Sequence, residues 1–390
     1  MKIVLFDGRS HKDLLPLSFT RPVSELRVGI FTIKEKWERY WKEDVGVYTL
    51  SYLAEKYKNA DWKEMIFLSG AVCPTKELID VLSSMQIGQK VKYGERTIAF
   101  ASSREVYESC GIDDFVVIDF RGELNIITDP GSLFEMNEKE IHNDIGVLGN
   151  SAQRVSSLDD NKVKGDQLYV EEGVEASDCI FNTTTGPIYL GKNSKLLEGS
   201  IIRGPFALCE GAVVKMSAKI YGATTIGPYC KVGGEISNSI IQGYSNKGHD
   251  GFLGNSVIGE WCNLGADTNT SNLKNNYGDI SAWSYESEDY EKRGRQFQGL
   301  IMGDHSKTGI NTMMNTGSVV GVSANVFGAG FPPKFIPSYS WGGSDGLTEF
   351  NKEKSFEVAE RMMGRRNVSF TDLDKDILSH IFKVTAKYRT

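Results

Sequence analysis

The sequence has no long hydrophobic run, no concentration of positive charge and no beginning that resembles a targeting signal. No stretch of about 18 consecutive apolar residues occurs, and Asp7 and Arg9 stand where a signal peptide requires an apolar segment. Lys and Arg are scattered along the chain, and the net charge is −7. We therefore expect a soluble cytoplasmic protein that has neither a membrane nor a nucleic acid as a partner.

Cysteine and proline are also sparse. The six cysteines lie far apart and form no Cys-x-x-Cys pair, which argues against a disulfide framework and against a zinc site. We expect them to be reduced thiols in the core. Glycine, by contrast, is abundant, with 41 residues against 10 prolines, and the excess falls in the second half of the chain. This bias favours a repeat architecture in that half.

An aliphatic residue recurs at every sixth position of the second half. The period is unbroken from Leu190 to Val232, reappears at Ile258 and Leu264, and then resumes further along the chain. A glycine often follows the repeating residue, and a small residue often lies four positions after it. The repeating residues are Leu190, Leu196, Ile202, Leu208, Val214, Ile220, Ile226 and Val232, and later Met302, Thr308, Met314, Val320 and Val326, of which all but Thr308 are apolar.

A six-residue period is typical of a solenoid, because each hexapeptide supplies a short strand and a corner, and stacked coils bury the aliphatic side chains. A helix repeats at about 3.6 residues and an ordinary strand at about 2, so neither explains the period. The pattern resembles the left-handed parallel β-helix, and the handedness is implied by that resemblance. We predict this all-β domain over residues 171–330, with insertions at 234–252 and 269–298.

The remaining segments predict three further parts of the chain. Residues 1–150 have the pattern of an α/β, Rossmann-like domain, and the polar residues 151–170 are typical of a linker. Residues 331–390 begin as an aromatic, proline-containing extended segment and continue as two helical patterns. We expect these helices to cap the solenoid or to dock on a neighbouring subunit. In the first domain, strands are expected at Ile3–Phe6, near 97–102 and near 115–120, and a helix near 33–40.

Function is expected where the repeat is interrupted, because loops that project from a regular scaffold can carry chemistry that the core cannot. The period fails after Val232, and His249 lies in this interruption, flanked by Gly248, Asp250 and Gly251. A neutral imidazole on such a turn is suited to act as a general base toward an attacking amine.

Asn263 is the second catalytic candidate. It lies beside the repeat position Leu264, so that it can occupy a coil next to the one that carries His249. Its amide could donate a hydrogen bond to a thioester carbonyl as negative charge develops on the oxygen. The alternative interpretation is an asparagine ladder that stabilises a corner of the solenoid.

Residues 244–268, YSNKGHDGFLGNSVIGEWCNLGADT, resemble the acetyltransferase half of the bifunctional bacterial family that acetylates glucosamine-1-phosphate and then uridylylates the product. The family's catalytic histidine and the aromatic residue three positions later correspond to His249 and Phe252. Its Asn-hydrophobic-Gly-Ala-Gly-Thr segment corresponds to residues 263–268, and a further asparagine of its substrate loop corresponds to Asn272. The resemblance implies that His249 deprotonates the amino sugar while Asn263 and Asn272 hold the acetyl donor or the sugar.

The match departs from the family pattern in its phosphate contacts. Phe252 replaces the usual tyrosine, and Asp267 replaces a glycine. Glu235 and Ser237 occupy the neighbourhood of the family's phosphate-binding lysine, so Glu235 is a candidate substrate contact. Three lysines could substitute for the missing one, namely Lys219, Lys231 and Lys247. Basic residues of the second insertion are candidates for the phosphates of coenzyme A, namely Lys274, Arg293 and Arg295.

Residues 6–37 resemble the signature of the sugar nucleotidyltransferases, in which a Gly-rich loop ending in Arg precedes a Leu-x-Pro-Leu element and a Pro-Lys pair. Gly8-Arg9, Leu15-Pro16-Leu17 and Arg21-Pro22 stand at these places. A backbone cradle with nearby cations suits a nucleoside triphosphate, so Gly8, Arg9 and Arg21, together with Arg27, are the nucleotide-binding candidates. The alternative is a degenerate domain in which these arginines pair with carboxylates. The metal ligands stay unassigned.

The two resemblances in this order imply a bifunctional enzyme of nucleotide-sugar and cell-envelope synthesis. It would acetylate an amino-sugar 1-phosphate from acetyl-CoA and, with Mg²⁺, transfer a uridylyl group from UTP to the sugar 1-phosphate. The family also implies a homotrimer with the active site at a subunit interface, and a three-fold ring closes on itself.

Three alternatives stay open. One is a protein with a single activity, either an acyltransferase with a degenerate first domain or a nucleotidyltransferase whose β-helix only trimerises it. Another is a metal hydratase on the same scaffold, although only His249 and His305 lie within the repeats and three histidine ligands are needed. The third is a purely structural solenoid, which would not need the turn with His249 or a long insertion.

Overall fold

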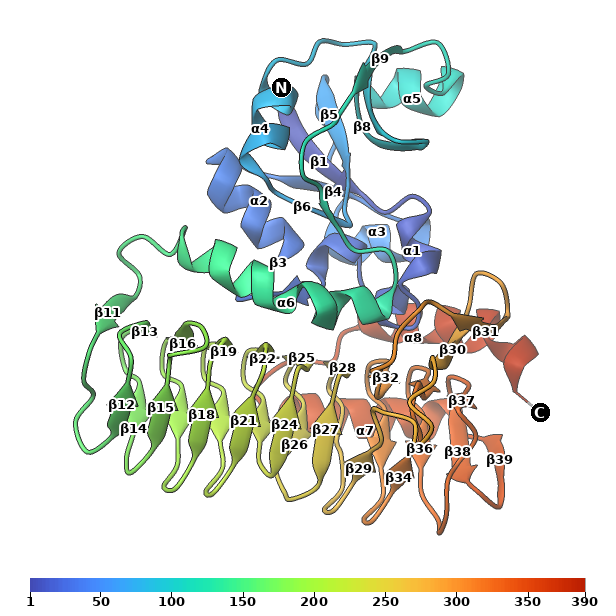
Figure 1. The fold of residues 1–390 in the computed structure, drawn as a ribbon. Coiled ribbons are helices and arrows are strands. Elements are labelled where there is room, and N and C mark those ends of the chain that lie inside the picture. The colour runs from blue at the N-terminus through green and yellow to red at the C-terminus, as the bar shows by residue number, and fades with distance from the viewer. Residues whose placement is uncertain (390) are drawn as a thin grey trace.

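The computed structural model describes residues 1–389 and shows an N-terminal α/β domain that lies against one side of a long β-solenoid (Figure 1). The N-terminal domain is built on a six-stranded sheet. In its strand β1, Ile3 and Leu5 point into one core and Val4 into another, as the alternation of side chains along a strand requires. In spatial order the strands are β4 (Gly46–Tyr48), β1 (Lys2–Phe6), β5 (Met65–Ser69), β8 (Arg96–Ser102), β7 (Gln89–Tyr93) and β9 (Val116–Asp119).

Helices surround this sheet, and the longest of them, α6, lies between the domain and the solenoid (Figure 1). Helix α2 begins at a capping box, in which the Thr32 hydroxyl accepts from the Glu35 amide and the Glu35 carboxylate accepts from the Thr32 amide. The strands and the helix that the sequence predicts in this domain are confirmed. The helices are α1 (Ser10–Asp13), α2 (Ile33–Trp41), α3 (Ser51–Tyr57), α4 (Lys76–Ser83), α5 (Arg104–Cys110) and α6 (Pro130–Ile145), and two short strand pairs are β2 (Arg27–Val28) with β3 (Phe31–Thr32) and β6 (Val72–Cys73) with β10 (Asn125–Ile126).

The solenoid has three sheets, which we call sheets 1, 2 and 3, wound around a common core. Apart from the antiparallel first strand of sheet 1, successive coils pair in parallel. Sheet 1 has ten strands and faces the N-terminal domain (Figure 1). It consists of β11 (Gln153–Val155), β13 (Leu168–Val170), β16 (Ile188–Leu190), β19 (Phe206–Leu208), β22 (Thr224–Ile226), β25 (Ile240–Gly243), β28 (Val257–Glu260), β32 (Ile301–Met302), β35 (Val319–Val320) and β37 (Phe335–Ile336).

Sheets 2 and 3 form the other two sides of each coil. Sheet 2 consists of β12 (Lys162–Lys164), β15 (Ile180–Asn182), β18 (Ile201–Arg203), β21 (Lys219–Tyr221), β24 (Glu235–Ser237) and β27 (Phe252–Gly254), followed by β29 (Asn269–Thr270) and β34 (Met313–Met314). Sheet 3 consists of β14 (Glu175–Ala176), β17 (Lys195–Leu196), β20 (Val213–Val214), β23 (Lys231–Val232) and β26 (Asn246–Lys247), followed by β33 (Lys307–Thr308), β36 (Asn325–Val326), β38 (Ser340–Gly343) and the antiparallel β39 (Gly346–Glu349).

The repeating aliphatic residues fill the core of the solenoid, as the six-residue period predicts. Leu190, Ile202 and Val214, one from each sheet, are fully buried. The predicted fold class is confirmed: a nucleotidyltransferase-like α/β domain, a left-handed parallel β-helix and C-terminal helices. Five cysteines are buried free thiols, as expected, and the side chain of Cys110 lies outside the described part of the structure.

The structure differs from the expected boundaries at three places. Residues 151–170, expected as a linker, contain strands β11, β12 and β13, so the coils begin earlier. The expected insertion at 234–252 is instead part of a shortened coil. Paired residues of neighbouring coils are 15 positions apart here, as in Lys231 and Asn246, whereas Lys195 and Val213 are 18 positions apart. The aromatic segment after residue 331 forms one more coil, with β37 and β38.

The second insertion, by contrast, does leave the coils. It follows β29 and forms a hairpin of β30 (Ser281–Ser284) and β31 (Asp289–Lys292), which reaches the N-terminal domain (Figure 1).

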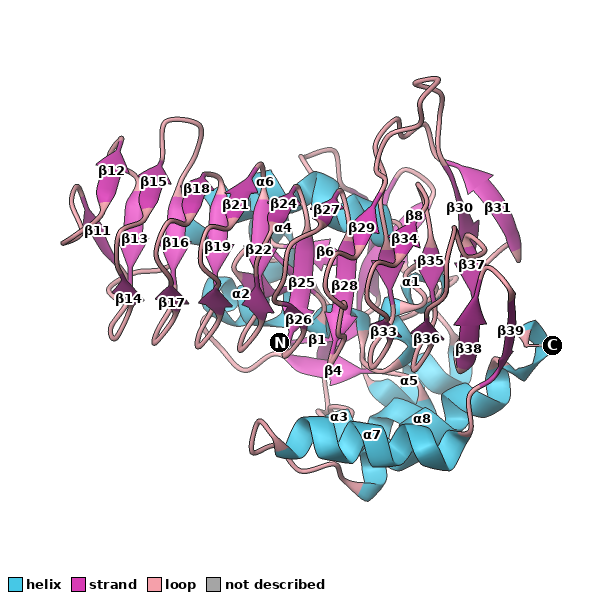
Figure 2. Ribbon diagram, turned by 90° about the horizontal axis from the view of Figure 1, so that it is seen from below, coloured by secondary structure: helices cyan, strands magenta, loops and turns pink. Residues whose placement is uncertain are grey.

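The two C-terminal helices pack within the same chain. Helix α7 (Lys352–Gly364) runs along the solenoid, and α8 (Asp372–Val384) lies beside it (Figure 2). Helix α8 also joins the two domains, because the ring of His380 stacks on Tyr52 at 4.0 Å and Lys56 pairs with Asp374 at 2.8 Å. In the part of the chain that the structure describes, no helix is long and apolar enough to cross a membrane.

Candidate functional site

A groove of about 840 Å³ lies between sheet 3 of the solenoid and helix α7. His249 and Asn263, the two catalytic candidates, both line it. Apart from Asn246, the rest of the lining is basic or apolar, and no Asp or Glu of the described residues belongs to it. It consists of Lys215, Lys231, Asn246, Gly248, Leu264, Gly265, Ala266, Lys307 and Ile310 from the solenoid and Val358, Arg361, Met362, Arg365 and Arg366 from the helix and the turn after it.

The coil geometry brings His249 and Asn263 to this groove. Asn246, Asn263 and Lys307 occupy equivalent positions of three successive coils, held by parallel bridges. His249 follows Asn246 by three residues, on the exposed turn that leaves β26. The imidazole of His249 and the amide of Asn263 make no hydrogen bond to other described residues, so both groups are available to a ligand. This does not support the reading of Asn263 as part of an asparagine ladder.

Lys247 holds the turn that carries His249. It occupies an inward-facing position between Val232 and Leu264 of the neighbouring coils, where a hydrophobic residue is usual. Its Nζ donates to the carbonyl oxygens of Gly233 at 3.0 Å and of His249 at 2.9 Å. Burial lowers the pKa of Lys247 to about 8. Its contacts are therefore those of a positioning residue, whereas the sequence suggested a contact with substrate.

The wall formed by α7 was not predicted from the sequence. Arg366, which follows the helix, donates from Nη2 to Oδ1 of Asn246 at 3.0 Å. Arg366 also lowers the pKa of Lys231, with smaller contributions from burial, Lys215 and Arg365. The basic run RMMGRR at 361–366 was the available signal, but it is also an ordinary pattern for the carboxyl end of a helix.

The other predicted substrate contacts lie together on sheet 2, outside the lining of the groove. Glu235 and Phe252 are paired in register, and Glu235 accepts a hydrogen bond of 2.7 Å from the Tyr221 hydroxyl. Asn272 donates from Nδ2 to Oδ1 of Asn255 at 2.8 Å, near Gly254. The turn with His249 connects sheet 3 to sheet 2. The groove residues on sheet 3 and the predicted substrate contacts on sheet 2 therefore lie on the two sides of one corner.

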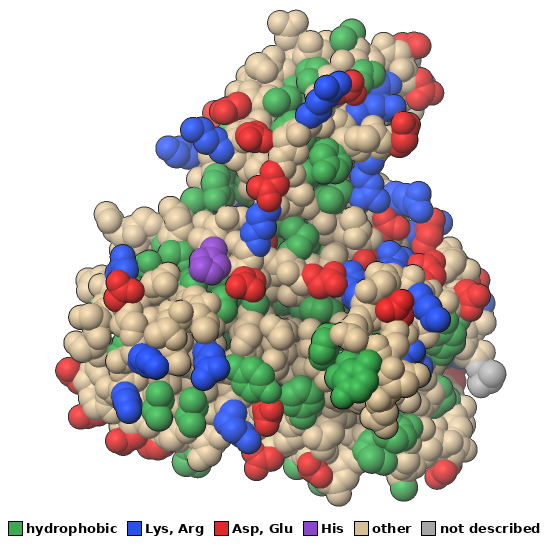
Figure 3. Space-filling view, in the orientation of Figure 1, with side chains coloured by type: hydrophobic (Ala, Val, Ile, Leu, Met, Phe, Trp, Pro, Cys, Tyr) green, Lys and Arg blue, Asp and Glu red, His purple; other side chains and the backbone are tan. Residues whose placement is uncertain are grey.

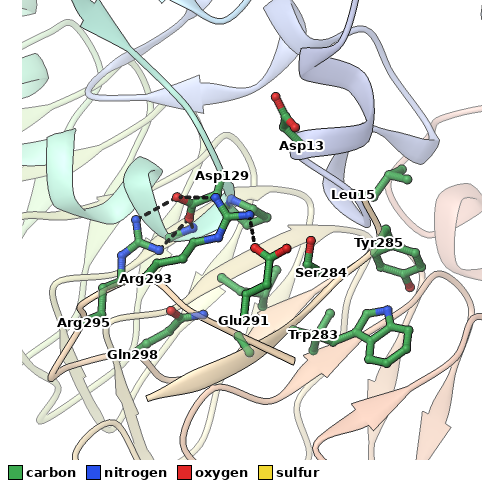
Figure 4. A pocket seen from close by; sticks show the side chains of 15 residues that line it. Asp13, Leu15, Asp129, Trp283, Ser284, Tyr285, Glu291, Arg293, Arg295 and Gln298 are labelled. Carbon is green, nitrogen blue, oxygen red and sulfur yellow. Dashed lines mark hydrogen bonds and ion pairs between the residues drawn. The ribbon is translucent and has the colours of Figure 1, made fainter. Parts of the chain in front are cut away.

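The predicted contacts to coenzyme A in the second insertion are engaged elsewhere. Lys274 donates to the carbonyl oxygen of Asp279. Arg295 pairs at 2.7 Å with both Asp129, at the start of α6, and Glu135. Figure 4 shows Arg295 and Arg293 converging on Asp129 in a small pocket between the hairpin and the N-terminal domain. These arginines attach the insertion to α6 and lie away from the groove with His249.

The nucleotide-binding candidates are only partly accessible. Gly8 has a φ of +47° in the turn after β1, and Arg9 is 72% exposed beside Asp13 and Glu286. Arg21 is buried in the domain interface, where Nη1 lies 2.6 Å from Oε1 of Glu260 and Nη2 contacts Asp304.

The usual ligand position of an open α/β sheet, beyond the carboxyl ends of its parallel strands, is covered here. The Val23 amide donates to Asp7 at 2.7 Å, directly after β1, and Thr49, after β4, donates to the same carboxylate. Burial raises the pKa of Asp7 to about 6. In the described residues no group of three or more His, Cys, Asp or Glu lies in position to hold a metal ion. No reaction step is therefore assigned to a metal.

Residues 3–153 match the family model of the sugar nucleotidyl transferases. The bifunctional protein GlmU of Wigglesworthia glossinidia brevipalpis is 22% identical over 330 residues, which cover 81% of this chain and 59% of that protein. The uncharacterized acetyltransferase YaiX of Escherichia coli (strain 536) is 26% identical over 153 residues, 38% of this chain and 66% of that protein. The chain thus spans less than two thirds of the length of these relatives.

Among solved structures, the polySia specific acetyltransferase NeuO superposes with a TM-score of 0.27 and 14% identity, covering 54% of this chain and 99% of that one. Residues 3–153 of the chain thus match the sugar nucleotidyl transferase model, and longer stretches of it are similar, at low identity, to bifunctional GlmU proteins.

Proposed function

We propose that the protein is an acyltransferase that transfers an acetyl group from acetyl-CoA to the amine of an amino-sugar 1-phosphate, with glucosamine-1-phosphate as the first candidate acceptor. The observation that carries the proposal is the single groove into which His249 and Asn263 both open, with neither side chain bound to another described residue. Similarity to acetyltransferases over part of the chain agrees with it.

In the proposed reaction His249 is the general base. It takes a proton from the attacking nitrogen as the nitrogen–carbon bond forms at the thioester carbonyl. Asn263 donates a hydrogen bond to the carbonyl oxygen, on which negative charge develops. As the carbon–sulfur bond breaks, the proton held by His249 passes to the leaving sulfur. The products are the N-acetylated sugar phosphate and free coenzyme A.

The test is an assay of thiol release from acetyl-CoA with glucosamine-1-phosphate as acceptor. His249→Ala should reduce the rate by about 10²-fold to 10⁴-fold, the usual contribution of a general base. His142→Ala is the matched control, because His142 is exposed on α6, away from the groove, and its loss should leave the rate unchanged. A rate in His249→Ala equal to that of the wild type would refute the general-base role.

Nucleotidyl transfer in the N-terminal domain is the second candidate activity, and the family match over residues 3–153 favours it. Because Val23 and Thr49 are bonded to Asp7 at the carboxyl ends of the parallel strands, this edge of the sheet would have to open before a nucleotide could enter. The assay is pyrophosphate release from UTP with Mg²⁺ and N-acetylglucosamine-1-phosphate. Activity would establish a bifunctional enzyme, whereas silence across several nucleotides and sugar phosphates would leave the acyltransferase with an inherited, inactive domain.

A homotrimer that associates through sheet 2 completes the proposal. Ile180, Ile201 and Tyr221 on this sheet are 38%, 47% and 39% exposed. Figure 3 shows further hydrophobic side chains in the open on the face of the solenoid that it displays. A trimer would bring a second copy to the corner where His249, Phe252 and Glu235 lie. Light scattering should give three times the chain mass, and Ile201→Glu should lower it; a monomer at all concentrations would contradict the assembly.

A further inference from the structure

The groove between the solenoid and α7 carries a concentration of positive charge that the proposed reaction does not use. Lys215 and Lys231 project from sheet 3, and Arg365 and Arg366 face them from the end of α7. None of these four side chains forms an ion pair within residues 1–389, whereas Lys195, at the equivalent position of sheet 3 two coils before Lys231, pairs with Glu175 at 2.8 Å.

Cations held together without counter-charges repel one another, so such a cluster lowers stability unless an anion neutralises it. The repulsion is visible at Lys231, whose pKa is lowered chiefly by Arg366 and then by burial, Lys215 and Arg365. The helix dipole explains arginines at the carboxyl end of α7. It does not explain Lys215, directly after β20, and Lys231, in β23, because they belong to the solenoid and line the same groove.

The distribution of the groove lining also indicates where the charge of a ligand would lie. Lys231, Asn246, Asn263 and Lys307 occupy successive coils, and neighbouring strands are about 4.8 Å apart, so Lys231 and Asn263 are separated by about 10 Å along the axis. Ile310 and Leu264 line the groove beside Asn263, and the ammonium of Lys307 on the next coil donates to the His305 carbonyl at 2.6 Å. Lys215, Arg365 and Arg366, by contrast, lie close enough to Lys231 to lower its pKa. A ligand that fits this order has an anionic group set back from its reacting group.

We infer that Lys215, Lys231, Arg365 and Arg366 form a diphosphate-binding subsite, which α7 completes across the groove from the solenoid. Two chemical sources carry a diphosphate set back from a reacting group, an acyl-coenzyme A and a nucleoside diphosphate sugar. Arg366 bonds to Asn246 and is thereby fixed over the groove, and its planar fork can bind phosphate oxygens in pairs. The inference rests on the proposed function for the identity of the groove, but the binding itself does not require catalysis.

The experiment is isothermal titration of the full chain with inorganic pyrophosphate, coenzyme A and UDP as separate probes. Lys231→Met and Arg366→Met keep most of the side-chain volume and should each weaken pyrophosphate binding by about tenfold or more, as expected for the loss of one charge-assisted contact. Binding should also weaken as salt is added, because the attraction is electrostatic. The probe whose affinity falls in parallel with that of pyrophosphate identifies the natural source of the diphosphate.

Lys195→Met is the matched control. Lys195 has the same outward register position on the same sheet as Lys231, two coils earlier, but it is paired with Glu175 and lies outside the groove. Its affinities should equal those of the wild type. Thermal melting of each variant separates lost binding from lost folding, and Arg366→Lys, which keeps the charge, should retain part of the affinity.

The subsite is overturned if none of the three probes binds to the folded wild type, or if Lys231→Met and Arg366→Met bind all of them as the wild type does. Failure of the proposed function has a different signature. In that case His249→Ala keeps the rate of thiol release, or no thiol is released at all, while pyrophosphate still binds and Lys231→Met still weakens it.

Discussion

The ammonium of Lys247 donates a hydrogen bond of 2.9 Å to the backbone carbonyl of His249, so that a buried cation fixes the turn of the proposed general base. The same ammonium bonds to Gly233 of the preceding coil at 3.0 Å. A lysine at a position that Val232 and Leu264 fill in the neighbouring coils has an energetic cost, which the lowered pKa of about 8 reflects. The cost is understandable if the turn must be rigid for catalysis.

The first prediction concerns this contact. Lys247→Met keeps the volume but leaves two carbonyl groups unpaired, and the turn with His249 becomes mobile. We expect kcat for thiol release to fall by about 10²-fold, the usual penalty for a misplaced catalytic group, with a smaller change in KM. Steady-state kinetics measure both.

Two further measurements separate positioning from folding in Lys247→Met. The exposed Lys195, which pairs with Glu175 at 2.8 Å and lies outside the groove, provides the control Lys195→Met, with wild-type kinetics expected. The melting temperature tests for general destabilisation. A folded Lys247→Met protein with wild-type kcat would show that the hydrogen bond to the turn has no role in the reaction.

The second prediction concerns the joint between the domains. Arg21 is buried and pairs with Glu260 and Asp304 of the solenoid, so Arg21→Met leaves the buried Asp304 carboxylate without its cation. The free energy of unfolding should fall by about 3–5 kcal/mol. Arg154→Met, which removes an exposed pair with Asp166, should cost no more than about 1 kcal/mol. Urea denaturation measures both, and equal effects of the two substitutions would contradict the structural role of Arg21.

The same arginine illustrates what a sequence can and cannot predict. The six-residue period determines the solenoid because every coil buries the same position, from Leu190 onward, and the pattern is local. The motif around Arg21 also identifies a family. It does not reveal which side of the domain another domain covers, and Arg21 therefore appeared as a nucleotide contact although it holds the solenoid.

The candidate site was predictable to a similar extent. His249 and Asn263 were found because a glycine-flanked histidine interrupts a regular repeat, and the coil geometry brings both to one groove. Arg366 was missed because its contact with Asn246 joins residues 120 positions apart. No local pattern indicates such a contact. Lys247 was found, but the sequence did not reveal that its side chain lies inside the coil, where it is buried.

The third prediction is a dependence of stability on pH. His305 is buried against Trp261, at the same corner of successive coils, and desolvation lowers its pKa to about 3, below the 6.5 of an unperturbed histidine. Below pH 6.5 the unfolded chain therefore binds a proton that the folded chain does not, and stability falls as the pH decreases from 6.5 toward 3. The slope approaches about 1.4 kcal/mol per pH unit below about pH 6.

His305→Asn isolates this effect, because asparagine tolerates the φ of +61° at this position and does not titrate. The buried carboxyl of Asp7, with a pKa raised to about 6, acts in the opposite sense but is present in both proteins. The difference in unfolding free energy between the wild type and the variant should therefore shrink or reverse on acidification from pH 7 to about pH 4.5. A difference that is constant across this range would contradict a neutral, buried His305.

The last prediction concerns Asn263 and distinguishes a contact in the transition state from a contact in the scaffold. Asn263→Ala removes the proposed donor to the thioester carbonyl, and we expect kcat to fall by about 10²-fold to 10³-fold, as for other single donors to a developing oxyanion. Asn325→Ala is the matched control, because Asn325 has the same register position two coils beyond Asn263, next to Lys307, but does not line the groove. If Asn263 acted only in the scaffold, both substitutions would lower the melting temperature alike and kcat would stay near the wild-type value in each. A large loss of kcat in Asn263→Ala with an unchanged melting temperature therefore assigns the amide to the reaction, because the backbone bridges that hold residue 263 between its neighbouring coils do not depend on its side chain.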